Sequence, residues 1–292
     1  MTFKYSITLS SFRRIETIEQ TLERLIRQGY DAVEMFGETE KLDVMGLQEI
    51  FQVFDIPVCG VTGMWGSISK DGWKRKFLSS DQSFITHSQE YVKRCVKMCQ
   101  SLGGDKLNIC LFADDQLSAF DRNHTVISED QKAHIIQQVI PILSKLARFA
   151  ADHDVKLLLE PLNRYSTPYC TTAKDAVAIA NQINQDNFGV LLDTFHMNIE
   201  EDSLEHAILK SEELLQHTHF ADNNRKMPGY AHIDFQSVVK SLEHIGYNQY
   251  ISFEPNLTNK EYELATKNGL DFIKDIEKNV RGKTELASSS AD

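Results

Sequence analysis

The chain has 292 residues, of which 41% are hydrophobic and 25% are charged, and its formal net charge at pH 7 is −11. This composition is ordinary for a globular protein that buries a large core, so it argues against a disordered chain. The negative charge argues against a nucleic-acid partner, because phosphate backbones are bound through clusters of Lys and Arg.

The N-terminal segment carries no sign of export or membrane insertion. Residues 1–10 lack a basic stretch followed by an apolar one, and no apolar run in the chain approaches membrane-spanning length. We therefore expect a cytoplasmic protein without a membrane partner.

Eight short apolar, β-rich runs are predicted as strands, at residues 3–9, 32–35, 57–62, 106–111, 155–160, 189–193, 217–220 and 250–254. Runs such as 155–159 alternate little between polar and apolar residues. Such runs are typical of parallel strands that are covered on both faces.

Stretches with helical periodicity separate these strands, at residues 17–28, 44–54, 81–102, 130–153, 172–184, 204–211, 235–245 and 261–278. Gly29, Gly103 and Gly246 follow three of them and are predicted to end those helices in the left-handed conformation.

Eight alternations of strand and helix predict parallel βαβ units, which close most naturally into a (β/α)₈ TIM barrel. An open doubly wound sheet is the alternative, but it would normally place a glycine-rich turn after its first strand, and residues 9–12 contain no glycine. We expect one barrel domain over residues 1–282 and a disordered tail over 283–292.

The five cysteines form an odd set without the paired spacing of a zinc or dithiol site. They are Cys59, Cys95, Cys99, Cys110 and Cys170. Cys95 and Cys99 are one helical turn apart, yet we interpret all five as reduced core thiols.

Ionisable residues end each of the last four predicted strands: Glu160, Asp193, His219 and Glu254, which are 33, 26 and 35 residues apart. Each interval is about one βα unit, so the four side chains should meet at the barrel mouth, where the active sites of such barrels lie. A single carboxylate here would as readily cap a helix or form a salt bridge. Four in register favour a functional site.

Converging carboxylates repel one another unless a cation or retained protons neutralise them, and a metal ion is the simpler solution. Three carboxylates and one imidazole suit Mn²⁺ first, with Mg²⁺ or Co²⁺ as alternatives. Such an ion can bind two neighbouring oxygens of a hydroxy-ketone and stabilise the enediolate that forms when a carbon-bound proton leaves. His217 shares a strand face with His219, but we interpret it as a core residue.

Four segments resemble the sugar isomerase/epimerase family of xylose isomerase-like TIM barrels, and most of all its D-tagatose and D-psicose 3-epimerases. The segments are EPLNRY at 160–165, LDTFHMNIE at 192–200, HTHFADNNR at 217–225 with Pro228-Gly229, and SFE at 252–254. The resemblance is specific in the second half of the chain, while the first half agrees only in the spacing of its elements.

The resemblance implies that Glu160 and Glu254 bind the metal ion and also exchange the substrate proton, one on each face of a planar enediolate. It implies that Asp193 and His219 are ligands only, and that His196 and Arg225 hold substrate oxygens. Inversion at one carbon requires an acid and a base on opposite sides, which two glutamates from separate strands can supply.

One position departs from the family. Its epimerases usually carry another glutamate six residues after the first ligand, where this chain has Ser166. We therefore expect Ser166 to contact the substrate and to alter sugar choice, so that a branched, oxidised or phosphorylated sugar, or a 1,2-isomerisation, stays open.

Two long loops, residues 63–77 and 112–129, are expected to cover the substrate, with Trp65 and Phe112 as pocket walls. Aromatic residues in long loops are as often simple packing anchors.

The leading hypothesis is a metal-dependent ketose 3-epimerase that takes a small keto-sugar, and the resemblance implies a homodimer or homotetramer. An aldose–ketose isomerase with the same metal site is the nearest alternative, and a non-catalytic sugar-binding barrel is a further one. An abasic-site endonuclease can share this barrel, but the negative charge argues against it.

Overall fold

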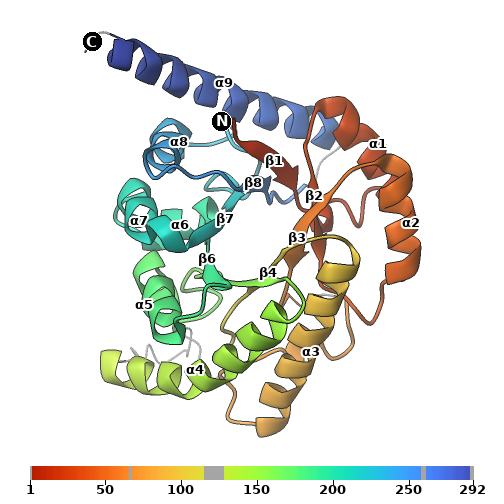
Figure 1. The fold of residues 1–292 in the computed structure, drawn as a ribbon, viewed down its shortest axis with the longest axis vertical. Coiled ribbons are helices and arrows are strands. Elements are labelled where there is room, and N and C mark those ends of the chain that lie inside the picture. Colours follow the sequence, from red (N-terminus) through yellow and green to blue (C-terminus); the bar gives the residue numbers. More distant parts are fainter. Residues whose placement is uncertain (1, 66–67, 115–127, 258–260, 290–292) are drawn as a thin grey trace.

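The computed structural model describes residues 2–65, 68–114, 128–257 and 261–289. Eight parallel strands lie in the order β1-β8-β7-β6-β5-β4-β3-β2. A parallel bridge between Thr8 and Glu34 brings the end of β1 to β2, so the sheet nearly closes on itself. Helices surround this sheet on the outside (Figure 1). The predicted (β/α)₈ barrel is confirmed.

All eight predicted strands are present, with ends within two residues of the predicted ones. They are β1 (Lys4–Ile7), β2 (Val33–Phe36), β3 (Val58–Thr62), β4 (Lys106–Ile109), β5 (Lys156–Leu159), β6 (Phe188–Asp193), β7 (Leu215–Phe220) and β8 (Tyr250–Phe253).

The main helices are α1 (Ile18–Gln28), α2 (Val44–Phe54), α3 (Gln82–Ser101), α4 (Glu129–Ala151), α5 (Ala173–Ile183), α7 (Leu204–Ser211), α8 (Phe235–His244) and α9 (Tyr262–Ser289). A short helix that we did not predict, α6 (Thr194–Glu200), follows β6 directly. Helix α9 continues into the segment that we expected to be a disordered tail, and residues 290–292 lie outside the described part of the chain.

Helix boundaries follow local capping chemistry. Thr17, Ser128 and Thr172 each form a capping box at the start of α1, α4 and α5, which satisfies two backbone N–H groups at each helix start. Gly29 ends α1 with φ of 85°, and Gly103 and Gly246 take φ of 79° and 66° after α3 and α8, as the sequence predicted.

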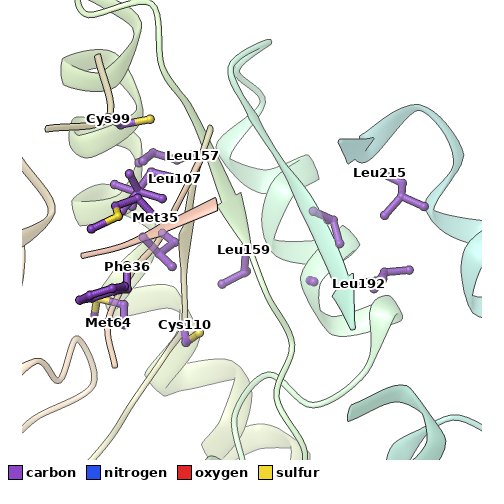
Figure 2. Packing of buried hydrophobic residues seen from close by; sticks show 14 of the residues in the cluster. Met35, Phe36, Met64, Cys99, Leu107, Cys110, Leu157, Leu159, Leu192 and Leu215 are labelled. Atoms are coloured by element: carbon purple, nitrogen blue, oxygen red, sulfur yellow. The ribbon is translucent and has the colours of Figure 1, made fainter. Parts of the chain in front are cut away.

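The hydrophobic core fills the layer between the strands and their covering helices. Figure 2 shows members of this core on β2, β4, β5, β6 and β7 together with Cys99 of α3. Apolar groups from the strands are thereby removed from water, which is the main favourable contribution to folding. No helix in the described ranges is both long and apolar enough to span a bilayer.

The register of β6, β7 and β8 sets side chains of the predicted site next to one another. Asp193 pairs with His219, and His219 pairs with Ser252, across three adjacent parallel strands. Because side chains alternate between the two faces of a strand, these residues point to the same interior.

Candidate metal centre and active site

The four side chains predicted as metal ligands lie together at the C-terminal ends of β5 to β8. Glu160, Asp193, His219 and Glu254 each offer one donor atom, and these atoms all lie within 4.8 Å of one another. The first three are fully buried, whereas the Glu254 side chain is 15% exposed. The structure thus places this donor set inside the barrel, at the rim formed by the C-terminal ends of these strands.

Backbone hydrogen bonds fix the strand ends that carry the two glutamates. The Glu160 N–H donates to the Ile109 carbonyl at 3.0 Å, and the Glu254 N–H donates to the Phe220 carbonyl at 3.1 Å. Both contacts continue the parallel ladder one residue beyond the end of the strand. Each carboxylate is therefore attached to backbone that hydrogen bonds hold in place.

Asp193 has two functions in the structure. Its Oδ1 accepts the Phe195 N–H at 2.8 Å and caps α6. Its Oδ2 lies 4.0 Å from His219 Nδ1, on the side of the donor cluster. The short helix α6 therefore orients the carboxylate, because one oxygen is committed to the helix and the other points inward.

His219 presents one ring nitrogen to the donor cluster and the other to Glu34. Its Nδ1 lies 3.1 Å from Glu254 Oε2 and 3.7 Å from Glu160 Oε1, yet it is a buried atom that makes no hydrogen bond with the described residues. Its Nε2 lies 3.0 Å from Glu34 Oε2. With Nε2–H donated to Glu34, the Nδ1 lone pair would be free for a cation held among the carboxylates, which is the arrangement of a histidine that binds a metal ion.

Glu34 of β2 is a buried centre of hydrogen bonds that the sequence analysis missed. Its Oε2 accepts from His219, from Ser252 Oγ at 2.8 Å and from His217 Nε2 at 3.3 Å, and its Oε1 accepts from Thr62 at 3.1 Å. Burial opposes ionisation, but the two histidines hold the pKa of Glu34 well below its usual range. His217 is thus a core residue, as predicted, with a polar contact to Glu34.

The same electrostatics act on His219. Burial lowers its pKa, but the charges of Glu34 and Glu254 outweigh burial and raise the pKa well above the usual value. The cluster therefore attracts positive charge strongly, which is what a cation-binding site requires.

Asn108 of β4 orients Glu160 and was also missed. Its amide nitrogen donates to Glu160 Oε2 at 2.5 Å, and its Oδ1 accepts the Gly63 N–H at 2.6 Å. The second contact fixes which way the amide faces, so Asn108 can only donate to the carboxylate. Cys110 Sγ lies 3.5 Å from the same oxygen, and burial together with Glu160 raises the pKa of this thiol.

Arg225 lies directly over the carboxylates. Its Nη1 is 2.5 Å from Asp193 Oδ2, its Nη2 contacts Glu254 Oε2, and its guanidinium lies 4.9 Å from the centre of the Phe195 ring. Although burial acts against its charge, Asp193 and Glu254 raise the pKa of Arg225 above its usual value. Burial raises the pKa of Asp193, but Arg225 and His196 lower it overall.

The loop that carries Arg225 is organised by Asp222, another residue that sequence reasoning missed. The fully buried Asp222 carboxylate accepts the backbone N–H groups of Gly229, Ala231 and Ile233. Arg225 takes a left-handed φ of 57°, and its N–H donates to the Asp222 carbonyl at 2.8 Å. Asp222 therefore fixes the loop from which the guanidinium reaches the site.

His196 of α6 is held in one tautomer. Its Nδ1 lies 3.1 Å from the Asn163 backbone nitrogen and 2.8 Å from the Asn163 side-chain nitrogen. A backbone N–H can only donate, so Nδ1 must accept, and the proton of the neutral ring lies on Nε2. That N–H is available to donate to an oxygen in the adjoining cavity, which His196 lines.

A cavity of about 400 Å³ opens beside the donor cluster, a size typical of small-molecule sites. Of the predicted site residues, Glu254, His196, Arg225, Ser166 and Trp65 line it. Phe112 is not among the lining residues but packs edge-on against Trp65, with ring centres 5.1 Å apart. Most of the loop that we expected to cover the site, residues 115–127, lies outside the described residues.

A buried ion pair supports the wall that carries Trp65. Arg75 and Glu38 lie 2.9 Å apart with side chains 1% and 2% exposed, and Arg75 Nη1 donates to the Trp65 carbonyl at 2.9 Å. Glu38 also lines the cavity and accepts from Ser69 and from the Ile68 N–H. The loop after β3 is therefore anchored by charges that the sequence did not single out.

Comparison with known proteins agrees with this fold. The family described as "Xylose isomerase-like TIM barrel" matches residues 22–276. The chain belongs to this family.

Named relatives within the family are sugar epimerases. An L-ribulose 3-epimerase of Methylomonas sp. (strain DH-1) is 26% identical over 78% of this chain and 74% of that protein. A 3-dehydro-D-guloside 4-epimerase of Escherichia coli (strain K12) is 26% identical over 89% of this chain and 95% of its own. Two D-psicose 3-epimerases reach 37% identity, but the chain covers only 39% and 41% of their length.

A solved structure supports the fold over most of the chain. D-psicose 3-epimerase with D-tagatose from Clostridium cellulolyticum H10 superposes with a TM-score of 0.78 at 22% identity, covering 94% of this chain and 99% of the other. These relatives are isomerase-class enzymes that act on sugars.

Proposed function

We propose that this protein is a metal-dependent ketose 3-epimerase that removes the proton on the carbon next to a sugar ketone and returns it from the other face. One observation carries the proposal: Glu160 and Glu254, from strands separated by β6 and β7, share a donor cluster with Asp193 and His219 beside a cavity of about 400 Å³. Family membership and the names of the relatives support the reaction class.

The residues present fit a divalent metal ion. His219 Nδ1 is a buried nitrogen that lacks a hydrogen-bond partner among the described residues and faces three carboxylates. We propose Glu160, Asp193, His219 and Glu254 as the ligands, and Mn²⁺ as the ion, with Mg²⁺ or Co²⁺ as alternatives. When bound, such an ion would polarise the substrate carbonyl and stabilise negative charge on adjacent oxygens.

The protein's own groups then divide the proton work. One glutamate takes the proton from the carbon next to the ketone, and the other donates a proton to the opposite face of the planar enediolate, so that the configuration inverts. His196 Nε2–H and Arg225 would donate to substrate oxygens and fix which carbon faces the glutamates. Ser166 and Trp65 would contact the remainder of the sugar.

A second candidate is epimerisation at C4 of a 3-keto sugar. The relative of which the chain covers 95% bears the name 3-dehydro-D-guloside 4-epimerase. The chemistry is the same, because in both cases the exchanged proton lies on the carbon next to a ketone. A 1,2-isomerisation would instead exchange a proton between C1 and C2.

Deuterium incorporation separates these candidates. We expect the Mn²⁺-loaded enzyme in D₂O to place deuterium at C3 of a free ketose such as D-psicose or L-ribulose. Label at C4 of a 3-keto glycoside would support the second candidate, and label at C1 or C2 the isomerase. Glu160→Gln and Glu254→Gln should each stop inversion. Gln249→Glu, which adds a carboxylate away from the donor cluster instead of removing one from it, should not. A wild-type protein that binds these sugars without exchanging any proton would be a sugar-binding barrel.

A further inference from the structure

A second cavity adjoins the active-site cavity beside the loop that follows β1. The first, of about 400 Å³, and the second, of about 190 Å³, share four lining residues: Ser10, Ser11, Arg13 and Asn256. The second adds Arg14. The two cavities are therefore adjacent, and we call them together the groove; it extends from Glu254 and Arg225 to two consecutive arginines.

The loop that carries the arginines has a defined conformation. Ser11 Oγ donates to the Pro255 carbonyl at 2.7 Å, which ties the loop after β1 to the loop after β8. Phe12 is buried, and its carbonyl accepts the N–H groups of Ile15 and Glu16. Arg13 and Arg14 thus project from a turn that is fixed on both sides.

Charges elsewhere in the groove are already paired. Glu38 pairs with Arg75 at 2.9 Å, and Arg225 pairs with Asp193 and Glu254. Arg13 and Arg14 are exposed and make no ion pair or side-chain hydrogen bond with another described residue. Two unpaired positive charges at one end of a cavity, in a protein whose net charge is −11, form a local attraction for anions.

Hydrogen-bond donors at this end come from the two arginines and the Asn256 amide rather than from the serines. Ser10 donates its hydroxyl hydrogen to Thr8 Oγ1 at 3.2 Å, and Ser11 donates its own to Pro255. A hydroxyl group has a single hydrogen to donate, so both serines are left as acceptors. A ligand group here meets guanidinium donors, which match oxyanions through paired N–H groups.

We propose that this end of the groove binds an oxyanion at the far end of the substrate, either a phosphate ester or a carboxylate, with Arg13 as the first contact and Arg14 as the second. This assignment rests on the proposed function, because it takes the reacting carbons to lie beside Glu160 and Glu254. It makes an acidic or phosphorylated keto-sugar a better substrate than its neutral counterpart.

Matched sugars test the proposal. D-fructose, D-fructose 6-phosphate and D-fructuronate share one skeleton, and D-ribulose with its 5-phosphate gives a second set. We expect kcat/KM for deuterium exchange to be at least about tenfold higher for an anionic sugar than for its neutral counterpart, as one charge-assisted contact provides. Preference for the phosphate or for the carboxylate identifies the source of the oxyanion.

Variants separate a specific contact from a general charge effect. Arg13→Ala/Arg14→Ala should bring the anionic-to-neutral ratio close to one, whereas Arg27→Ala/Arg148→Ala, which removes the same charge from exposed sites outside both cavities, should leave it unchanged. A wild-type ratio of one or less, or a ratio that survives the first double variant, overturns the proposal.

Failure of the proposed function is recognised separately. If no sugar exchanges a proton, the same ratio is measured from dissociation constants of D-fructose and D-fructose 6-phosphate by calorimetry. Tighter binding of the phosphate that requires Arg13 and Arg14 supports the anion site, and equal binding refutes it.

Discussion

Replacing Glu34 tests whether this residue orients His219 for the metal ion that we propose. Glu34 Oε2 lies 3.0 Å from His219 Nε2 inside the barrel, with the Glu34 side chain 2% exposed. Loss of such an outer partner typically weakens metal binding about 10- to 100-fold. In Glu34→Gln an amide oxygen can still accept from Nε2, but the negative charge is lost, so we expect a decrease near tenfold. Glu34→Ala removes the acceptor as well and should reach about 100-fold, or ~2.8 kcal/mol.

The assay is an equilibrium titration of metal-free protein, with Mn²⁺ followed by electron paramagnetic resonance and Co²⁺ by its visible absorption. Ser252→Ala is the matched control, because it removes a buried neutral donor from the same Glu34 oxygen and leaves the contact with His219. We expect it to weaken binding by about threefold or less. Thermal unfolding of each variant shows that it is folded. Wild-type Mn²⁺ affinity in a folded Glu34→Ala protein would show that Glu34 does not orient His219.

Three further predictions concern substrate binding, acid stability and thiol reactivity. Arg225→Lys keeps the charge but loses the paired N–H groups, so kcat/KM for the keto-sugar should fall about 10- to 100-fold in a steady-state assay. Mn²⁺ binding should persist in this variant. An unchanged kcat/KM would show that Arg225 does not bind the substrate. Burial raises the pKa of Glu16, but its hydrogen bonds to Arg24 and Tyr262 lower it overall. A lowered pKa stabilises the fold above the ordinary value of 4.5 and loses that contribution as pH falls through the folded value. The free energy of unfolding of Glu16→Gln should therefore be about 1–3 kcal/mol lower than that of the wild type at pH 7. Urea titrations should show this difference shrinking below pH 4.5. A difference that does not change with pH would contradict the assigned role of Glu16. All five cysteines are buried, and burial raises the pKa of Cys95 and of Cys99 to about 12, so a thiol reagent should label the native protein only at its unfolding rate; rapid labelling would contradict this burial.

The barrel and the donor cluster were predictable because both depend on regular intervals along the chain. Parallel strands of a barrel end at one rim, so ionisable residues one βα unit apart must meet there whatever lies between them. Asp193 and His219 are neighbours in register, which their spacing of 26 residues implied. The same reasoning found Glu254 and Glu160, because each can be placed at the rim once the strand that it follows is recognised.

The supporting residues were not predictable, because their partners are set by closure of the barrel. Glu34 contacts His219 185 positions away and Ser252 218 positions away. The sequence showed only that Glu34 is a single charged residue in an apolar strand, which does not identify the residues that it contacts. Asn108 gave a similar signal on β4. Helix α6 was missed because it has only seven residues, and its cap, Asp193, had already been assigned to the metal.

The two glutamates that we propose as proton-exchanging groups differ in their surroundings. Glu160 is buried and receives a fixed donor from Asn108. Glu254 lines the cavity, is 15% exposed, and is held by Arg225, a side chain that would also bind the substrate in the proposed reaction. A carboxylate whose partner is rigid and neutral keeps its position through a catalytic cycle, whereas one whose partner is exchangeable changes its environment when substrate enters. In the proposed reaction the two faces of the sugar would therefore meet carboxylates in unlike surroundings. Proton removal from the two epimers would then proceed at unequal rates, even though one donor cluster holds both groups.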